Sequence, residues 1–214
     1  MSLSKTQLGL RARLGAGARY DSESAPAREL AWARGGTAYF ARLLNELVDD
    51  ELDHPSLLPG RSRRHVVAEI GYQARAIART VELARGASEE PIYSRKDQLL
   101  HETDFALSLR SDALRHLFKH SEVHLNVEWR DLVDDEWDRE VHLPDGGRVT
   151  PRQTVPVRAL SLWLRGISLG NGGRTADVPK DLLEYFHLRS SGGQELREAM
   201  RLARLTAVAA NYML

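Results

Sequence analysis

A histidine and a glutamate lie four residues apart in the apolar stretch RRHVVAEIGYQ, which spans residues 63–73. If this stretch is helical, His65 and Glu69 share one helix face and lie close enough to interact. Tyr72 follows one turn further along the same helix. An imidazole and a carboxylate at this spacing suit three kinds of site: half of a metal centre, an acid–base pair, or a buried polar contact. The spacing alone leaves all three open.

Three histidines, His116, His120 and His124, recur at i, i+4 and i+8. On a helix they form a single stripe, and imidazoles at this spacing can ligate a metal ion. Because histidines also occur on solvated or half-buried helix faces, we expect such a face here. The chain contains no cysteine. This excludes disulfides, a zinc ribbon and a cysteine nucleophile, so any thiol chemistry needs a thiol from outside.

Periodic apolar residues predict the helices that position these groups. Ser62 and Ser111 are predicted to cap two of them, and Gly86 to end one. Pro156 is expected to delay or kink the first turn of another. The predicted helices lie within 27–50 and over 63–85, 112–133, 151–169, 180–189 and 194–211.

The stretch WDREVHLPDGGRVT, residues 137–150, has a different pattern. Val141 and Leu143 alternate with polar residues, and DGG provides the turn, which predicts a small β-hairpin over 139–149. We expect it to pack on the end of a helix bundle, near the site. The expected fold class is mainly α: a four-helix bundle with this hairpin before the fourth helix and extra C-terminal helices.

The composition indicates one globular domain: the chain has 214 residues, of which 42% are hydrophobic and 28% charged, and its formal net charge is zero. Zero net charge disfavours a nucleic-acid partner. No apolar run reaches the roughly 18–20 residues that span a bilayer, and no secretory signal is recognised. We therefore expect a cytoplasmic protein, a monomer or a homodimer, with no nucleic-acid or membrane partner.

Three segments are expected along the chain. Residues 1–26 are rich in Arg, Gly and Ala and then polar, which predicts a flexible arm. Residues 27–190 are expected to form the helical bundle. Residues 191–214 are expected to form a last helix whose apolar side packs on the bundle or on a partner subunit.

Four strings of the chain carry a further signal. They are GGTAYFARLLNELVDDELDHPSLLPGRSRRHVVAEIGYQARAIARTVELARGASEEPIY, DALRHLFKHSEVHLNVEWRDLVDDEWDREV, WLRGISLG and ADVPKDLLEYF. With the order of elements, they resemble the family of mycothiol-dependent maleylpyruvate isomerases, over roughly residues 28–188. The resemblance implies a DinB-like four-helix bundle. The family usually has a second, C-terminal domain, and we expect the helix at 194–211 to stand in its place.

By this resemblance, three positions correspond to the family's ligands for a divalent metal, usually zinc. His65 is retained, whereas Ser161 and Arg165 occupy the positions of the glutamate and the second histidine. Serine is a poor zinc ligand, and a guanidinium cannot ligate a metal. We therefore expect no metal at His65, which is the only retained family ligand, and no zinc cofactor.

Three further positions depart from the family pattern. Arg61 replaces a tryptophan, Glu69 a second histidine and Ser168 an aspartate. A rebuilt metal site would need the retained histidine and Glu69 together with His116 or His120.

The changed positions are linked through charge. Arg165 places a positive charge where the family has its metal, and Glu69 supplies a counter-charge across the site. Since an unpaired buried charge is strongly unfavourable, we expect Arg165 within hydrogen-bonding reach of Glu69 or of a bound anion. His65 would then be the acid–base residue, with Glu69 as its catalytic partner.

Polar residues on the fourth helix form a stripe spaced 3-4-3, from Arg158 to Ser168. Such a stripe can hold a carboxylate or a developing enolate, with arginine as the fork. The expected substrate-binding residues are Arg165, Ser161, Tyr72, Arg158 and Arg61.

Hydrophobic periodicity alone gives the opposite orientation of this helix. Leu160, Leu164 and Ile167 would face the core, and the polar stripe would be solvated. The resemblance favours the first orientation, because the matched positions point into the family's cavity.

Three functions stay open from the sequence. The first is a divergent, metal-independent enzyme of specialised metabolism that uses acid–base chemistry on a small anionic or electrophilic metabolite. Its reaction would be an isomerisation, a thiol addition or elimination, or a ring closure. The second is a catalytically inactive ligand-binding or regulatory protein. The third is a mycothiol-dependent isomerase or S-transferase with a rebuilt metal site, and mycothiol could serve the first as a co-substrate too.

Overall fold

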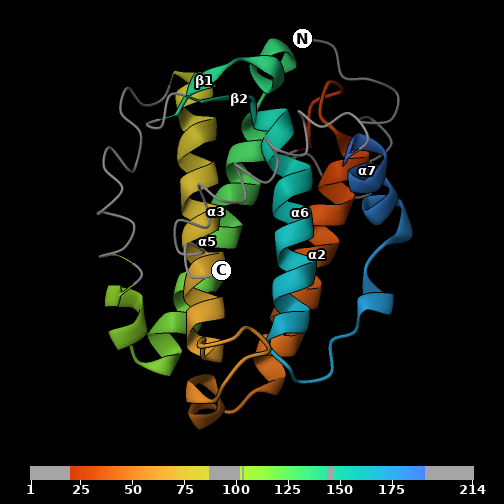
Figure 1. Ribbon diagram of the computed structural model, residues 1–214. Helices are drawn as coiled ribbons and strands as arrows, with labels where there is room; N and C mark the ends of the chain where they lie inside the picture. The colour runs from red at the N-terminus through yellow and green to blue at the C-terminus, as the bar shows by residue number, and fades with distance from the viewer. Residues whose placement is uncertain (1–19, 87–101, 103, 144–146, 191–214) are drawn as a thin grey trace.

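Four long helices form the body of the computed structural model, which describes residues 20–86, 102, 104–143 and 147–190. They lie side by side (Figure 1) and are α2 (Ala27–Glu46), α3 (Arg63–Arg85), α5 (Ser111–Asp131) and α6 (Pro151–Ser168). Helix α6 packs against α2 and α3, and α3 also packs against α5. The predicted fold class, a mainly helical DinB-like bundle, is confirmed.

Shorter elements flank these helices. Helix α7 (Lys180–Ser190) packs against α2, where Trp32 Nε1 donates to Asp181 Oδ2 at 2.7 Å (Figure 1). No helix in the described part of the chain is long and apolar enough to cross a membrane. The 3-10 helices are η1 (Asp49–Asp53), η2 (Asp134–Asp138) and η3 (Thr175–Asp177), and residues 104–108 are also helical.

Local sequence signals set the helix ends. Ser62 is the N-cap of α3, and Gly86 ends that helix with φ at +72°, a left-handed conformation that favours glycine. These two predicted ends are confirmed. Helix α6 begins with a capping box, in which the Thr150 N–H donates to Gln153 Oε1 at 2.9 Å.

One predicted helix cap and one predicted effect of a proline differ from the structure. Arg110, rather than Ser111, is the N-cap of α5, and Ser111 is its first helical residue. Helix α6 starts at Pro151 and includes Pro156, so the expected delay of its first turn does not occur. The Thr150 cap and a proline at the first helical position set the start of this helix before Pro156 is reached.

Two apolar clusters form the core, one toward each end of the bundle. The first surrounds Phe40 and Phe118, and the second surrounds Trp129 and Trp137. Between them, hydrogen-bonded side chains from all four long helices form what we call the polar layer. The polar layer consists of Thr37, Gln73, Glu122, Arg158 and Ser161.

The predicted β-hairpin is present, with β1 (Val141–His142) antiparallel to β2 (Arg148–Val149). It covers the end of the bundle where α3 finishes (Figure 1), since Arg139 Nη1 donates to the carbonyl of Ala84 at 2.6 Å. The hairpin is far from His65, so the expectation that it lies near the site is wrong for that residue. That residue lies in the first turn of α3, roughly 30 Å away along the helix at about 1.5 Å per residue.

The segments predicted at the two ends of the chain fall largely outside the described residues. Of the arm predicted for 1–26, the structure describes residues 20–26. This part is attached to the bundle, because Trp137 Nε1 donates to Ser22 Oγ at 3.0 Å. The helix predicted for 191–214 lies outside the described residues.

Gly36 lets α2 and α6 approach closely, and this contact predicts a cost of adding one methyl group. A Cβ at Gly36 would lie 2.9 Å from Leu162 Cβ, whereas a Cβ at Gly35 would lie 3.5 Å from the Trp163 ring. We expect Gly36→Ala to lower the free energy of unfolding by about 1–3 kcal/mol, because the helices must separate. The matched control Gly35→Ala should be neutral or stabilising by up to about 1 kcal/mol. Urea denaturation measures both, and equal effects would contradict the close approach.

Candidate functional site

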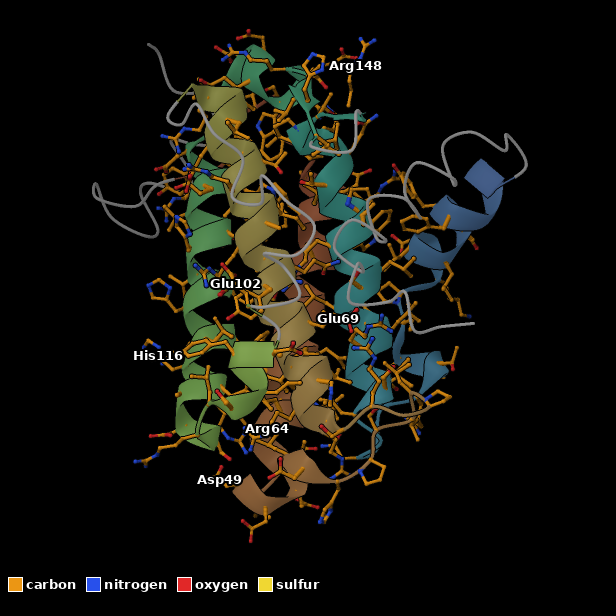
Figure 2. The ribbon with its side chains drawn as sticks, turned by 60° about the vertical axis from the view of Figure 1, so that its left-hand side comes forward. Asp49, Arg64, Glu69, Glu102, His116 and Arg148 are labelled. Carbon is orange, nitrogen blue, oxygen red and sulfur yellow. The ribbon has the colours of Figure 1, made fainter. Side chains whose placement is uncertain are left out.

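An ion pair joins α3 and α6 at the position that the resemblance assigns to a metal. Arg165 Nη2 donates to Glu69 Oε1 at 2.7 Å, and Nε of the same guanidinium donates to the same oxygen at 3.2 Å. The Glu69 side chain is 8% exposed and that of Arg165 18%, so water screens the pair weakly. Figure 2 shows Glu69 on α3 in the middle of the bundle. The expected contact between Arg165 and Glu69 is confirmed.

His65 takes part in the cap of its own helix. The backbone N–H of Ser62 donates to His65 Nδ1 at 3.2 Å, and the Ser62 hydroxyl lies 2.8 Å from the same nitrogen. A backbone N–H can only donate, so Nδ1 is an acceptor and the neutral ring carries its proton on Nε2. The arrangement is a capping box with histidine where glutamate or glutamine is usual. His65 can therefore offer a ligand one donor, Nε2–H.

The surroundings of His65 favour its neutral form. Partial burial lowers the pKa of His65 below its ordinary value, and the positive charge of Arg61 lowers it further. The negative charges of Asp104 and Glu69 oppose this shift. A neutral imidazole with a lowered pKa can polarise a developing oxyanion through its N–H. At neutral pH the arrangement thus suits His65 to donate a hydrogen bond rather than to accept a proton.

Arg158 is completely buried two turns before Arg165. Its guanidinium forms an ion pair with Glu122 of α5 and donates to Gln73 Oε1 of α3. Glu122 also accepts a bond from Thr37 Oγ1 of α2 at 2.8 Å. Burial lowers the pKa of Arg158 to about 9, which leaves the guanidinium charged at neutral pH. Arg158 of α6 thus contacts α3 through Gln73 and α5 through Glu122, and Glu122 in turn contacts Thr37 of α2. These contacts connect all four long helices at one height of the bundle.

The polar stripe of α6 faces the interior of the bundle. Arg158 is 0% exposed, whereas Leu164 is 42% exposed. The orientation that hydrophobic periodicity gives is therefore wrong for both residues. The physical reason is that Glu122 and Gln73 supply buried partners for the guanidinium, and an apolar pattern carries no information about partners on other helices.

Three other polar positions, Ser161, Ser168 and Arg61, have different surroundings. Ser161 accepts a hydrogen bond from Gln73 Nε2 at 2.9 Å and belongs to the polar layer. The Ser168 hydroxyl donates to the carbonyl of Leu164 at 2.8 Å within its own helix. Arg61 lies close enough to the start of α3 for its charge to act on the imidazole there.

Tyr72 has a separate set of neighbours. The Arg75 guanidinium lies 5.4 Å from the centroid of its ring. Burial raises the pKa of the Tyr72 hydroxyl, and the negative charge of Glu102 raises it further. No hydrogen bond links Tyr72 to Glu69 or Arg165 in the part of the chain that the structure describes, so its substrate-binding role stays a prediction.

Three members of the polar layer, Thr37, Gln73 and Glu122, are absent from the predicted site residues. Gln73 continues the i, i+4 series that His65 and Glu69 begin, so its position could have been predicted from spacing. Thr37 and Glu122 meet across 85 residues of sequence, and Glu122 meets its arginine across 36. Contacts between separate helices leave no such periodic signal.

The three spaced histidines form the expected stripe on α5. The ring centroids of His116 and His120 are 5.9 Å apart, and those of His120 and His124 are 6.5 Å apart. His116 and His120 are exposed and His124 is half-buried, and Figure 2 shows His116 on the outer side of α5. The expected solvated or half-buried face is confirmed.

The residues at the family's metal position do not fit a zinc centre. The Ser161 hydroxyl accepts a bond from Gln73, Arg165 is a cation paired with Glu69, and the helix cap uses Nδ1 of His65. A catalytic zinc site needs about three protein ligands with free lone pairs and one open position. Within the described residues, no close group of three or more His, Asp or Glu side chains includes His65.

Comparison with known proteins points to one family. The sequence model described as "Mycothiol maleylpyruvate isomerase N-terminal domain" matches residues 33–169. Two crystal structures are similar to the chain: the mycothiol-dependent maleylpyruvate isomerase and a histidine-to-alanine mutant of it. Each has a TM-score of 0.71 and 31% sequence identity, over 75% of this chain and 67% of that chain. No curated protein sequence matches the chain.

The Glu69–Arg165 pair predicts a non-additive double-mutant cycle. Arg165→Met leaves Glu69 buried without its partner, so the free energy of unfolding should fall by roughly 3 kcal/mol. Glu69→Gln combined with Arg165→Met removes both charges and should recover at least about half of that loss. Arg148→Met, which breaks an exposed pair with Glu140, is the control and should cost about 0.5 kcal/mol or less. Denaturant unfolding measures the parent, the single variants Glu69→Gln and Arg165→Met, the double variant and the control, and additive losses would argue against coupling.

His65→Gln tests the pH dependence that the lowered pKa of His65 implies. Because the pKa of His65 is lower in the folded state than in the unfolded state, protonating His65 below the unfolded pKa of about 6.5 destabilises the folded state. His65 therefore contributes stability that is present above that pH and is lost as the pH falls toward its folded pKa. Glutamine keeps the capping-box acceptor but does not titrate.

The variant should match the parent at pH 8 and lose less stability than the parent between pH 7 and pH 5. Thermal unfolding across that range makes the measurement. If the two curves stay parallel, His65 has the same pKa in the folded and unfolded states.

Proposed function

The chain belongs to the family of the mycothiol maleylpyruvate isomerase N-terminal domain, and on this premise we propose that it is a divergent, metal-independent enzyme. Its substrate is a small anionic or electrophilic metabolite of specialised metabolism. The reaction is an isomerisation, a thiol addition or elimination, or a ring closure, and it takes place in the cytoplasm.

The geometry of the Glu69–Arg165 pair carries this proposal. Nε and Nη2 of Arg165 both donate to one oxygen of Glu69. Among the described residues, nothing accepts a hydrogen bond from Nη1, and the side chain is 18% exposed. Arginine presents its donors in a rigid fork that suits carboxylates. Glu69 thus orients the guanidinium, and the remaining edge is available to a carboxylate or an enolate oxygen.

His65 is the second group of the proposed site. It precedes Glu69 by one helical turn, and its neutral ring carries the proton on Nε2, as its cap hydrogen bond requires. The Nε2–H would donate to the oxyanion that develops on the substrate. Removing one donor of this kind typically lowers turnover about 100-fold to 1000-fold.

Mycothiol suits this site as a co-substrate, because the chain has no cysteine of its own. A thiolate that adds to a conjugated double bond turns the attached carbonyl into an enolate. Expulsion of the thiolate after rotation restores the double bond in the other geometry. The protein then needs only to stabilise the anion, which cationic and N–H groups do without a metal ion.

A catalytically inactive, ligand-binding protein is the second candidate, and one observation favours it. Polar groups of the site already have partners inside the protein: Glu69 with Arg165, Gln73 with Ser161, and the Nδ1 of His65 with the helix cap. Such a set can be purely structural. Turnover separates the two candidates, since both predict ligand binding.

Turnover assays on protein purified without chelator test the proposal. We expect maleylpyruvate, or another small unsaturated 2-oxo acid, to be converted with mycothiol at a rate that dialysis against EDTA leaves unchanged. His65→Gln should lower kcat/KM about 100-fold, and so should the charge-free pair Glu69→Gln with Arg165→Met. The surface variant Arg148→Met should match the parent. Binding without turnover would favour the second candidate, and loss of turnover in EDTA would favour a rebuilt metal site.

Restoring the family's residues at two positions should create a zinc site, which tests the proposal in the opposite direction. Ser161→Glu with Arg165→His restores the family's ligand set around His65. This double variant should bind zinc at least about tenfold more tightly than the parent and lose the EDTA-insensitive turnover. Both proteins should also carry His124→Ala, so that zinc on the histidine stripe does not contribute. A parent that already holds one zinc ion, lost on His65→Gln, would show that the metal-independent proposal is wrong.

A further inference from the structure

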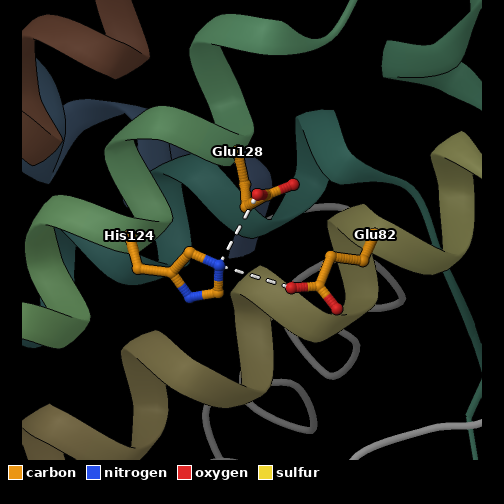
Figure 3. Close-up of side chains that lie close together, drawn as sticks. All are labelled: Glu82, His124 and Glu128. Atoms are coloured by element: carbon orange, nitrogen blue, oxygen red, sulfur yellow. Dashed lines mark ion pairs between the residues drawn. The ribbon is translucent and has the colours of Figure 1, made fainter. Parts of the chain in front are cut away.

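A second group of ligand-type side chains lies between α3 and α5, away from the Glu69–Arg165 pair. His124 Nε2 is 3.4 Å from Glu82 Oε1 and 3.5 Å from Glu128 Oε1 (Figure 3). One ligand atom from each residue lies within 4.8 Å of the others. The side chains are 41%, 21% and 13% exposed for His124, Glu82 and Glu128. The group is therefore partly sheltered but open to ions from solvent.

These distances match the edges of a small coordination polyhedron. Zinc–nitrogen and zinc–oxygen bonds of about 2.0–2.1 Å in a tetrahedron place neighbouring ligand atoms roughly 3.3–3.4 Å apart. The two distances from the His124 nitrogen already have this length. All three ligand atoms lie within 4.8 Å of one another, so small side-chain rotations bring them onto one ion.

The outer oxygens of both carboxylates are held in place by arginines. Arg79 Nη1 lies 2.8 Å from Glu82 Oε2, and Arg85 Nη1 lies 2.6 Å from Glu128 Oε2. Each Oε1 is thereby turned toward His124. Hydrogen bonds of this kind to the outer atoms of a ligand orient metal sites and raise their affinity.

The ligand set also indicates the kind of ion. Two carboxylate oxygens face the same imidazole nitrogen, and an imidazole ligand favours zinc and similar ions over calcium and magnesium.

We propose that Glu82, His124 and Glu128 bind a divalent transition-metal ion, with zinc as the probe of choice and water in the remaining position. The site lies roughly 20 Å along α3 from Glu69, at about 1.5 Å per residue. It is therefore distinct from the family's metal position, and it does not depend on the proposed function. Its effect is to clamp the C-terminal half of α3 to α5, so bound zinc stabilises the folded chain.

Isothermal titration calorimetry of the full chain with zinc chloride alone tests this proposal. We expect one ion per chain, bound without competition from millimolar magnesium. His124→Ala and the isosteric Glu82→Gln should each weaken binding at least about tenfold. The matched controls are His116→Ala, an exposed histidine on the same stripe, and His65→Gln, and both should bind zinc as the parent does. Zinc should also raise the Tm of the parent and of the controls, but not that of His124→Ala.

Circular dichroism establishes whether each variant is folded. If His124→Ala does not fold, Glu82→Gln still tests the proposal. Absence of binding at 0.1 mM zinc overturns the proposal. So does binding that survives both His124→Ala and Glu82→Gln, or binding that His116→Ala or His65→Gln abolishes, because the ion would then be held elsewhere.

Discussion

A completely buried guanidinium is the constraint on which this bundle depends. Arg158 must find its partners inside the protein, and it finds them on two other helices, in Glu122 and Gln73. Thr37, on the remaining long helix, supports the carboxylate of Glu122. Removing one partner would leave a buried charge uncompensated, which costs about 3–5 kcal/mol. The polar layer therefore sets the register of four helices more strictly than the apolar clusters on either side of it could.

The same constraint decides where the proposed site lies. Ser161 and Gln73 of the polar layer lie one turn from Arg165 and Glu69, so the interior stays polar from the bundle centre toward the start of α3. The polar part of the interior ends at His65, in the first turn of α3. A metal ion would supply a positive charge that depends on its concentration, whereas Arg165 supplies one that is permanent. Because Glu69 is part of the fold, that charge stays compensated when no ligand is present.

Much of the fold could be predicted from the sequence, because helix ends depend on local signals such as Ser62 and Gly86. The contact between Glu69 and Arg165 could be predicted as well, since charge balance at one known position requires it. The polar layer could not. Its contacts join separate helices, and hydrophobic periodicity placed Leu164 in the core and Arg158 in water, the reverse of the structure. Of the three members missing from the predicted site, Thr37, Gln73 and Glu122, only Gln73 left a spacing signal.

The electrostatics near His65 connect ligand binding with protonation. Burial is the first cause of its lowered pKa, and the positive charge of Arg61 is the second. A substrate carboxylate on Arg165 would share that guanidinium with Glu69, so two negative charges would face one positive charge. A further cation nearby would stabilise such an arrangement, and the positive charge of Arg61 already acts on His65. The charge that helps to keep the imidazole neutral would thus also attract the anion, so ligand binding should raise the pKa of His65 and couple its protonation to occupancy of the site.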